Sequence, residues 1–272
     1  MNKVNWSLTP IIFLAACASM SPPTPTATVT PELRKQFAPS GTLIAGVNFG
    51  NPVIAQKDPA GGDPRGVGPE LARELARRLD VPIRYVVYDT AGKMADAGKQ
   101  GAWDVAMLAV DPARAQDIAF SEPYVLIEGT YMVRANSPLT RLEEFDKKGL
   151  RISVALKSAY DLYLTREIKN AELVRVATSQ AAIDDFVAGK VDVVAGVWQP
   201  LDTTAKKVPG LRVIDGSYMS IGQASGVPKA RARAAAYLRD FIEEMKASGF
   251  VARKLQESGI TDAKVAPPAK SS

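Results

Sequence analysis

The chain contains no histidine among its 272 residues and a single cysteine, Cys17. Without an imidazole ring, Ser-His-Asp and Cys-His catalysis, histidine-bearing zinc sites and an imidazole proton switch are all excluded. One cysteine excludes an internal disulfide, a four-cysteine metal site and an iron–sulfur cluster. We therefore expect neither a metal site nor a bound cofactor.

The chain also lacks a strong excess of charge of one sign. Lys and Arg number 34 against 29 Asp and Glu, and the two kinds are interleaved along the sequence. No basic arm is formed, so we expect a mixed-charge surface and no nucleic-acid partner. With 46% hydrophobic and 23% charged residues, the composition is that of a globular chain with one large core or two smaller ones.

The amino terminus carries an apolar stretch that is too short for a permanent membrane span. Residues 1–20 read MNKVNWSLTPIIFLAACASM, and the run LAAC at 14–17 resembles the bacterial lipobox, in which the chain is cut before the cysteine and a lipid is attached to its sulfur. The alternatives are a buried core cysteine and a plain signal peptide that contains one. We expect residues 1–16 to be a lipoprotein signal peptide and Cys17 to carry the lipid.

The next segment has the composition of an extended tether. Residues 19–31 read SMSPPTPTATVTP, rich in Pro, Ser and Thr and without periodic apolar residues. We assign residues 17–40 to the lipidated cysteine and this tether. Two or three acyl chains on Cys17 would suffice to anchor the folded body at a membrane surface.

From residue 41 onward, short β-rich runs alternate with amphipathic helical stretches. Leu71, Leu75 and Leu79 recur four residues apart on one helix face, which predicts a buried side. The pattern predicts strands over 42–49, 83–88 and 104–110, with helices over 69–79 and 91–99 between them. This βαβαβ order implies a parallel sheet with helices on its faces.

A second set of elements repeats this order. The pattern predicts strands over 151–156, 173–176 and 191–197, helices over 159–168 and 180–188, and two terminal helices over 231–246 and 251–257. Both sets share a helix exit that turns into a buried strand, GAWDV at 101–105 and GKVDV at 189–193, which indicates two lobes built alike. A cleft between such lobes, at the carboxyl ends of parallel strands, is where ligands bind.

Five segments resemble, in order, the landmarks of family 3 extracytoplasmic solute-binding proteins. They read GTLIAGVNFGNP, GVGPELARELARRLDVPIRYVVY, GAWDVAMLAVDPARAQDIAFSEPYV, RISVALKSAYDLYL and AAIDDFVAGKVDVVAG. The resemblance covers residues 41–260 and implies the α/β type II periplasmic-binding fold, with two lobes, each a mostly parallel sheet flanked by helices, and two hinge-crossing strands. Members of this family capture polar amino acids or related small acids and deliver them to an ABC importer.

The resemblance also implies a domain map and a set of partners. Lobe 1 is expected over 41–127 and 221–262, lobe 2 over 128–220, and a flexible tail over 263–272, with crossings near 126–130 and 218–222. The implied partners are a small carboxylate solute and an ABC permease with its ATPase. The chain is then a monomer of the periplasm or cell envelope, anchored to the outer or the cytoplasmic membrane.

Arg114 is the residue to which the resemblance assigns the ligand carboxylate. It ends the run Asp-Pro-Ala-Arg at 111–114, where the family's arginine binds that group. A planar guanidinium can make two parallel charge-assisted hydrogen bonds to a carboxylate. The alternative is a surface arginine on a short helix.

Two positions depart from the family pattern. Ala109 stands where a Ser or Thr hydroxyl would help to hold the carboxylate, and Val197 stands where an aspartate would pair with an α-ammonium group. An ammonium facing a valine would lose water without gaining a partner. We therefore expect a carboxylate ligand without a conventionally bound α-amino group, with an apolar or aromatic body.

The other candidate ligand contacts lie near predicted strand ends, helix starts and crossings. They are Asn48, Phe49 and Asn51 after the first strand, Ser158 and Tyr160 at a helix start, Trp198 at a strand end, and Glu128 and Gln223 near the crossings. The competing interpretations are turn chemistry for the asparagines, helix capping for Ser158, and packing for Phe49 and Trp198.

Non-catalytic binding is the function favoured by these residues, and we expect no enzyme. The alternative is an enzyme of the same fold that resembles cyclohexadienyl dehydratase, which eliminates water and carbon dioxide with a cleft glutamate. That position falls on Tyr160, with Asp161 the nearest acid, so the expected general acid is missing. A sensor lobe of a signalling protein would need a separate membrane-bound partner.

Overall fold

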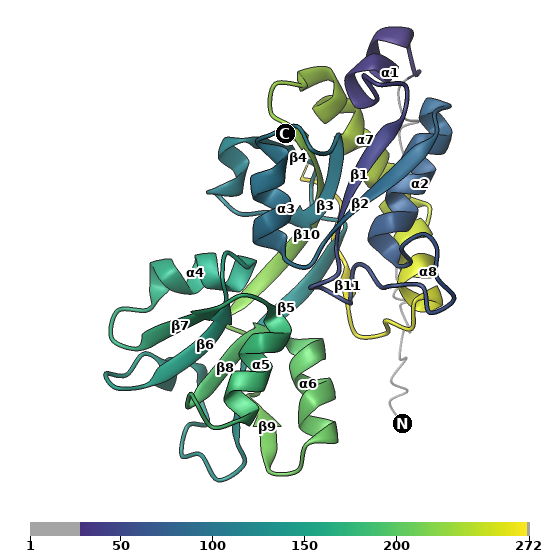
Figure 1. Cartoon of the computed structure of the whole chain (residues 1–272). Helices are drawn as coiled ribbons and strands as arrows, with labels where there is room; N and C mark the ends of the chain where they lie inside the picture. The colour runs from purple at the N-terminus through teal and green to yellow at the C-terminus, as the bar shows by residue number, and fades with distance from the viewer. Residues whose placement is uncertain (1–27, 271–272) are drawn as a thin grey trace, which may run out of the picture.

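The computed structural model describes residues 28–270, and the predicted signal peptide, Cys17 and the tether up to residue 27 lie outside them. Figure 1 shows two groups of helices and strands joined by two long strands, β5 (Val125–Arg134) and β10 (Met219–Pro228). These two strands pair antiparallel over residues 125–129 and 219–223. They are the two crossing strands of the predicted fold.

The first group is a sheet in the order β2-β1-β3-β10, in which β1 pairs parallel with β2 and β3. Its strands are β1 (Leu43–Asn48), β2 (Ile83–Tyr88), β3 (Val105–Ala109) and β4 (Ile118–Phe120). The helices around it are α2 (Val67–Leu79), α3 (Ala91–Gly98), α7 (Ala232–Ala247) and α8 (Phe250–Glu257). Strand β10 closes this sheet by pairing antiparallel with β3 and β4.

The second group repeats the arrangement, with β6 pairing parallel with β7 and β8, and β8 pairing antiparallel with β5. Its strands are β6 (Arg151–Ala155), β7 (Glu172–Val176), β8 (Val193–Val197) and β9 (Leu211–Val213). Its helices are α4 (Ala159–Glu167), α5 (Ser179–Val187) and α6 (Trp198–Lys207), with a short 3-10 turn η2 (Leu142–Phe145). The predicted α/β fold with mostly parallel sheets is confirmed.

The shared sequence signature has the same structural role in both groups. Gly101 and Gly189 follow a helix with φ of 71° and 76°, a left-handed turn that favours glycine. The aspartate three residues later then holds the neighbouring strand: Asp104 Oδ2 accepts from Ile44 N at 3.0 Å, and Asp192 Oδ2 accepts from Arg151 N at 2.9 Å. The two groups are therefore built from equivalent helix–turn–strand units.

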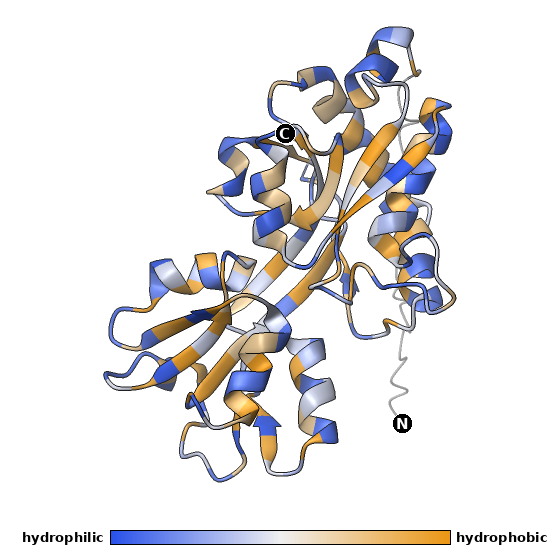
Figure 2. Cartoon of the chain, viewed as in Figure 1, coloured by the Kyte–Doolittle hydropathy of each residue, from blue (hydrophilic) through white to orange (hydrophobic). Residues whose placement is uncertain are grey.

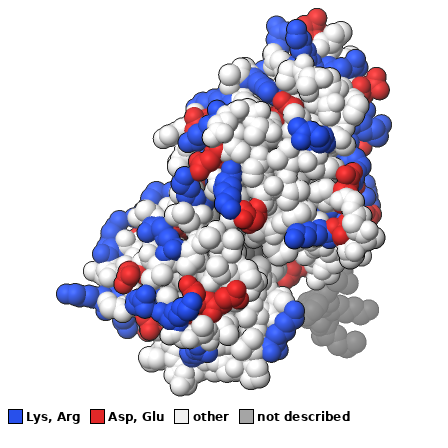
Figure 3. Space-filling view, in the orientation of Figure 1, with Lys and Arg blue, Asp and Glu red and all other residues white. Residues whose placement is uncertain are grey.

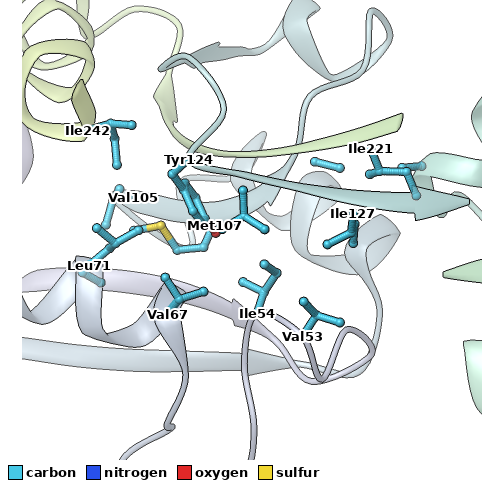
Figure 4. Packing of buried hydrophobic residues seen from close by; sticks show 14 of the residues in the cluster. Val53, Ile54, Val67, Leu71, Val105, Met107, Tyr124, Ile127, Ile221 and Ile242 are labelled. Carbon is cyan, nitrogen blue, oxygen red and sulfur yellow. The ribbon is translucent and has the colours of Figure 1, made fainter. Parts of the chain in front are cut away.

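The predicted apolar helix face packs against the sheet. Leu71, Leu75 and Leu79 of α2 are fully buried, and Figure 4 shows Leu71 close to Val105 and Met107. Figure 2 shows the same separation along most helices, with hydrophobic residues toward the strands and hydrophilic residues outward. Each leucine buried in this way contributes about 1.5–3 kcal/mol to folding.

The end of the predicted tether is part of the folded body. Residues 31–37 form α1 (Pro31–Phe37), which begins at Thr30, whose hydroxyl accepts from Leu33 N at 3.2 Å. Phe37 is fully buried and meets the Tyr237 ring edge-on, with centroids 5.8 Å apart. The expected tether boundary at residue 40 is therefore corrected, because Leu33 and Phe37, four apart, form a small apolar face that docks on α7.

The expected flexible tail over 263–272 also contains structure. Lys264 and Val265 form β11, which pairs antiparallel with Leu126 and Val125 of β5, and Ala266 N donates to Tyr124 O at 3.0 Å. Two residues are too few to show a strand period, so the sequence gives no sign of this pairing.

Charges of both signs are interspersed over the face shown in Figure 3, as the composition predicts. Among residues 28–270, no helix has the length and apolar character needed to cross a bilayer.

Candidate ligand-binding site

A pocket lies where strand ends of the two groups meet. It has a cavity of about 50 Å³ and is lined by Asn48 at the end of β1, Ala109 at the end of β3, Ala155 at the end of β6 and Val197 at the end of β8. Gly50 and Ser179 line both this pocket and a wider groove of about 750 Å³. The carboxyl ends of parallel strands thus form the walls, as expected for an α/β ligand site.

Arg114 is the one charged side chain among the described residues that line the pocket. It starts the 3-10 turn after β3 and is 5% exposed. Its guanidinium donates to Ala109 O and to Lys157 O, both at 2.9 Å. Burial lowers the pKa of Arg114 to about 10, while Asp111 and Asp96 act in the opposite direction. The side chain therefore presents an oriented, poorly hydrated positive charge at neutral pH.

The start of α4 forms the wall opposite β3. Ser158 is the N-cap, and its hydroxyl accepts from Asp161 N at 3.0 Å. The preceding residue, Lys157, has φ of 57°, and its N–H donates to Asp161 Oδ2 at 2.7 Å. The nine-residue helix thus directs its amino terminus, the positive end of its dipole, toward the pocket.

Tyr160 packs on this wall with its hydroxyl 3.0 Å from Ser179 Oγ. Burial raises the pKa of Tyr160, and hydrogen bonding to Ser179 opposes that rise. Asp161 is not among the residues that line the pocket. Its carboxylate accepts a hydrogen bond from Arg175 Nε at 2.9 Å. The nearest acid to the position expected for a catalytic glutamate is therefore bound by Lys157 N and Arg175 Nε.

Three amides line the opposite side of the pocket. Asn48 Oδ1 accepts from Gly50 N at 2.8 Å, so this side chain stabilises the turn after β1. Asn51 Oδ1 is buried without a hydrogen-bond partner within the described residues. Gln223 is 4% exposed on β10. These side chains supply neutral hydrogen-bonding groups but no negative charge.

The family model of bacterial extracellular solute-binding proteins, family 3, matches residues 43–257. The chain belongs to this family. Its members are extracellular proteins, which implies a periplasmic or envelope location, and the resemblance inferred from the sequence is confirmed.

Solved structures support the family fold at low sequence identity. A mutant of ArgBP from T. maritima matches with a TM-score of 0.71 at 21% identity, covering 84% of this chain and 99% of the other. The ancestral amino acid-binding protein AncCDT-1, a precursor of cyclohexadienyl dehydratase, matches with a TM-score of 0.70 at 20% identity, covering 82% and 98%. The substrate binding protein of an amino acid ABC transporter matches with a TM-score of 0.69 at 17% identity, covering 80% and 98%.

Most of the candidate residues for this family 3 protein meet in one pocket. Its lining includes Arg114, Asn48, Asn51, Ala109, Ser158, Tyr160 and Gln223. Phe49 instead lines the wider groove, with Lys57 Nζ 5.8 Å from its ring centre. Glu128 and Trp198 line a separate hollow of about 310 Å³ beside Lys264. Their role in ligand binding stays a prediction.

Several lining residues were not among the sequence candidates. Thr90 and Ser179 stand at the starts of α3 and α5, in the short turns after β2 and β7, so the strand-end signal that identified Asn48 also applied to them. Met107, Leu108 and Ile221 lie within strands and carry no such signal. No group of three or more metal-ligating side chains is present within residues 28–270.

Proposed function

We propose that this family 3 protein is the extracytoplasmic substrate-binding component of an ABC importer and captures a small carboxylate-bearing solute between two closing lobes. The observation that carries this proposal is Arg114, which is buried, charged and oriented toward a pocket between the strand ends of both groups. A carboxylate can take both of the parallel N–H donors of a guanidinium, and a partly dry pocket strengthens that pair.

Closure is supported by contacts between the proposed lobe 1, residues 41–127 and 221–262, and the proposed lobe 2, residues 128–220. Arg114 donates to Lys157 O, Lys157 Nζ lies 2.7 Å from Asp96 Oδ2, and Arg166 Nη1 lies 3.1 Å from Asp111 Oδ2. β5 and β10 are the proposed hinge strands. A ligand that contacts both lobes favours the closed arrangement by its differential affinity.

We propose that the protein is not an enzyme. The described lining has no acidic side chain and no histidine to move a proton, and Asp161 is engaged by Lys157 and Arg175. Turnover assays with prephenate and arogenate test this point, since measurable product would make the dehydratase-like alternative the better assignment.

The proposal extends to the cell envelope. Lipid on Cys17 would hold a monomeric receptor at the membrane, where an ABC permease and its ATPase accept the solute. Fractionation of cells that carry Cys17→Ser tests the anchor, because loss of the lipid should release the protein from the membrane fraction.

A thermal-shift screen tests the binding function itself. The protein from Ala18 onward is screened against amino acids, aromatic acids and dicarboxylates, and a ligand at a hundred times its Kd should raise Tm by roughly 5 °C or more. Arg114→Ala should abolish that shift, whereas the matched control Arg84→Ala, on the exposed face of β2, should keep it. An unchanged shift in Arg114→Ala would contradict the carboxylate assignment.

A further inference from the structure

The described lining of the pocket carries a positive charge and no negative charge. Arg114 is the single charged residue in the described lining. The nearby acids are engaged elsewhere: Asp111 accepts from Ala113 N at 2.8 Å and pairs with Arg166, and Asp96 pairs with Lys157. No carboxylate in the described lining is therefore free to neutralise a positive group on a ligand.

An ammonium next to the ligand carboxylate would lie in an unfavourable field. It would be close to the Arg114 guanidinium and to the amino terminus of α4, both of which are positive. Val197, at the end of β8, gives this wall of the pocket an apolar surface. Burying a charged group without an opposite charge is strongly unfavourable.

A neutral donor on the ligand has a partner in this pocket. Asn51 lines it, and Asn51 Oδ1 is buried without a hydrogen bond within the described residues. A buried amide oxygen can accept from a ligand hydroxyl. One neutral acceptor satisfies such a hydroxyl, but it does not replace a carboxylate opposite an ammonium.

The wider groove offers an apolar surface for the rest of the ligand. Its apolar lining includes Phe49, Val87, Tyr88 and Pro200, and its basic residues are Lys57 and Lys93. Val87 is 45% exposed here, and Leu156, at the edge of the pocket, is 48% exposed. The acid of this groove, Asp89, pairs with Lys93 at 2.8 Å. Exposed apolar side chains beside a polar pocket are typical of a binding groove.

We infer that the pocket selects carboxylates that carry hydrogen or hydroxyl, and not ammonium, on the carbon next to the carboxylate, with an apolar body that lies in the groove. This inference rests on the proposed solute-binding function and names the chemical class of the solute.

Matched ligands that differ in one substituent test the inference. The purified protein is titrated calorimetrically with 3-phenylpropanoate, phenyllactate and phenylalanine, with 4-methylpentanoate, its 2-hydroxy derivative and leucine, and with glutarate, 2-hydroxyglutarate and glutamate. In at least one series the unsubstituted or hydroxy acid should bind roughly a hundredfold more tightly than the amino acid. The phenyl and 4-methylpentanoate series probe the apolar part of the groove, and the dicarboxylates probe its Lys57 with a second carboxylate.

The outcomes separate the two proposals. An amino acid that binds as tightly as its unsubstituted and hydroxy counterparts overturns this inference and leaves solute binding intact. Absence of binding throughout the nine compounds overturns the proposed carboxylate-binding function, and the inference with it.

A gain of function at Val197 gives a second readout. Val197→Asp adds a carboxylate to the lining and should shift preference toward the amino acid at least about tenfold, because an ammonium then gains an opposite charge. The matched control Val197→Asn has the same shape without the charge and should not shift it. Equal shifts in both variants would contradict the electrostatic argument, and Tm measured without ligand verifies that each variant is folded.

Discussion

Gly92 lies where α3 of the proposed lobe 1 meets the start of α4 in the proposed lobe 2. A Cβ added at Gly92 would lie 2.6 Å from Lys157 Cβ and 3.3 Å from Leu156 O. The first distance is far shorter than the 3.4 Å at which ordinary contacts begin. Gly92→Ala should therefore obstruct the closed arrangement, whereas it leaves separated lobes unhindered.

Gly92→Ala should leave the stability of the ligand-free protein equal or slightly higher, but it should weaken ligand binding. An alanine in a helix is more favourable than a glycine by about 0.5–1 kcal/mol, so the variant without ligand should melt at the same temperature or slightly higher. Overpacking at a rigid contact costs about 1–3 kcal/mol, so ligand Kd should rise roughly 5- to 150-fold. Calorimetry with a ligand from the thermal-shift screen measures Kd, and a thermal melt measures stability.

A compensating substitution makes the test specific. Lys157 has φ of 57°, which glycine adopts readily, so Lys157→Gly removes the opposing Cβ without backbone strain. It also removes the ion pair with Asp96, but both side chains are about half exposed and such pairs contribute little. The double variant should recover most of the affinity lost by Gly92→Ala. An unchanged Kd in Gly92→Ala, or no recovery in the double variant, would refute the reasoning.

Three further predictions address the interlobe ion pair, the charge of the pocket and the amino-terminal helix. Arg166→Met should raise the ligand Kd roughly tenfold in calorimetry. The Asp111 carboxylate is only 4% exposed, and without Arg166 it keeps a single backbone donor in the closed arrangement. A lower Tm with an unchanged Kd would contradict this prediction. Ligand affinity should stay level from about pH 6 to about pH 9 and fall as the pH approaches the lowered pKa of Arg114, about 10, because loss of that proton removes the charge that attracts the carboxylate. Phe37→Ala should lower the free energy of unfolding by about 3–5 kcal/mol in denaturant titrations and leave Kd unchanged, since Phe37 is fully buried against α7 and remote from the pocket; a stability loss under about 1 kcal/mol would indicate that α1 is not part of the core.

The regular part of the fold was predictable from apolar periodicity. The strand predicted over 83–88 coincides with β2, and the leucine face of α2 is fully buried. The segments that were missed have little period to detect. In α6, Leu201 is the one buried residue of ten, so no repeating apolar face marks this helix in the sequence. Helix α1 and strand β11 are short and depend on contacts with α7 and β5, which are distant in sequence.

The site was predictable where it depends on strand ends and on the family pattern. Asn48 ends β1, Arg114 and Ser158 follow β3 and β6, and all three line the pocket. The sequence does not indicate which way a side chain points at such an end. Phe49 follows Asn48 but lines the groove, since successive side chains of an extended chain point to opposite sides.

Strand β11 also has a consequence for solubility. β5 pairs with β10 along residues 125–129 and with β8 from residue 129 onward, so its other edge over residues 125–126 is covered by Lys264 and Val265. An uncovered strand edge is a template for pairing with another molecule. Lys264 and Val265 therefore protect this edge of β5 from pairing with another molecule. A chain shortened before Lys264 would expose the edge to intermolecular strand addition and aggregation.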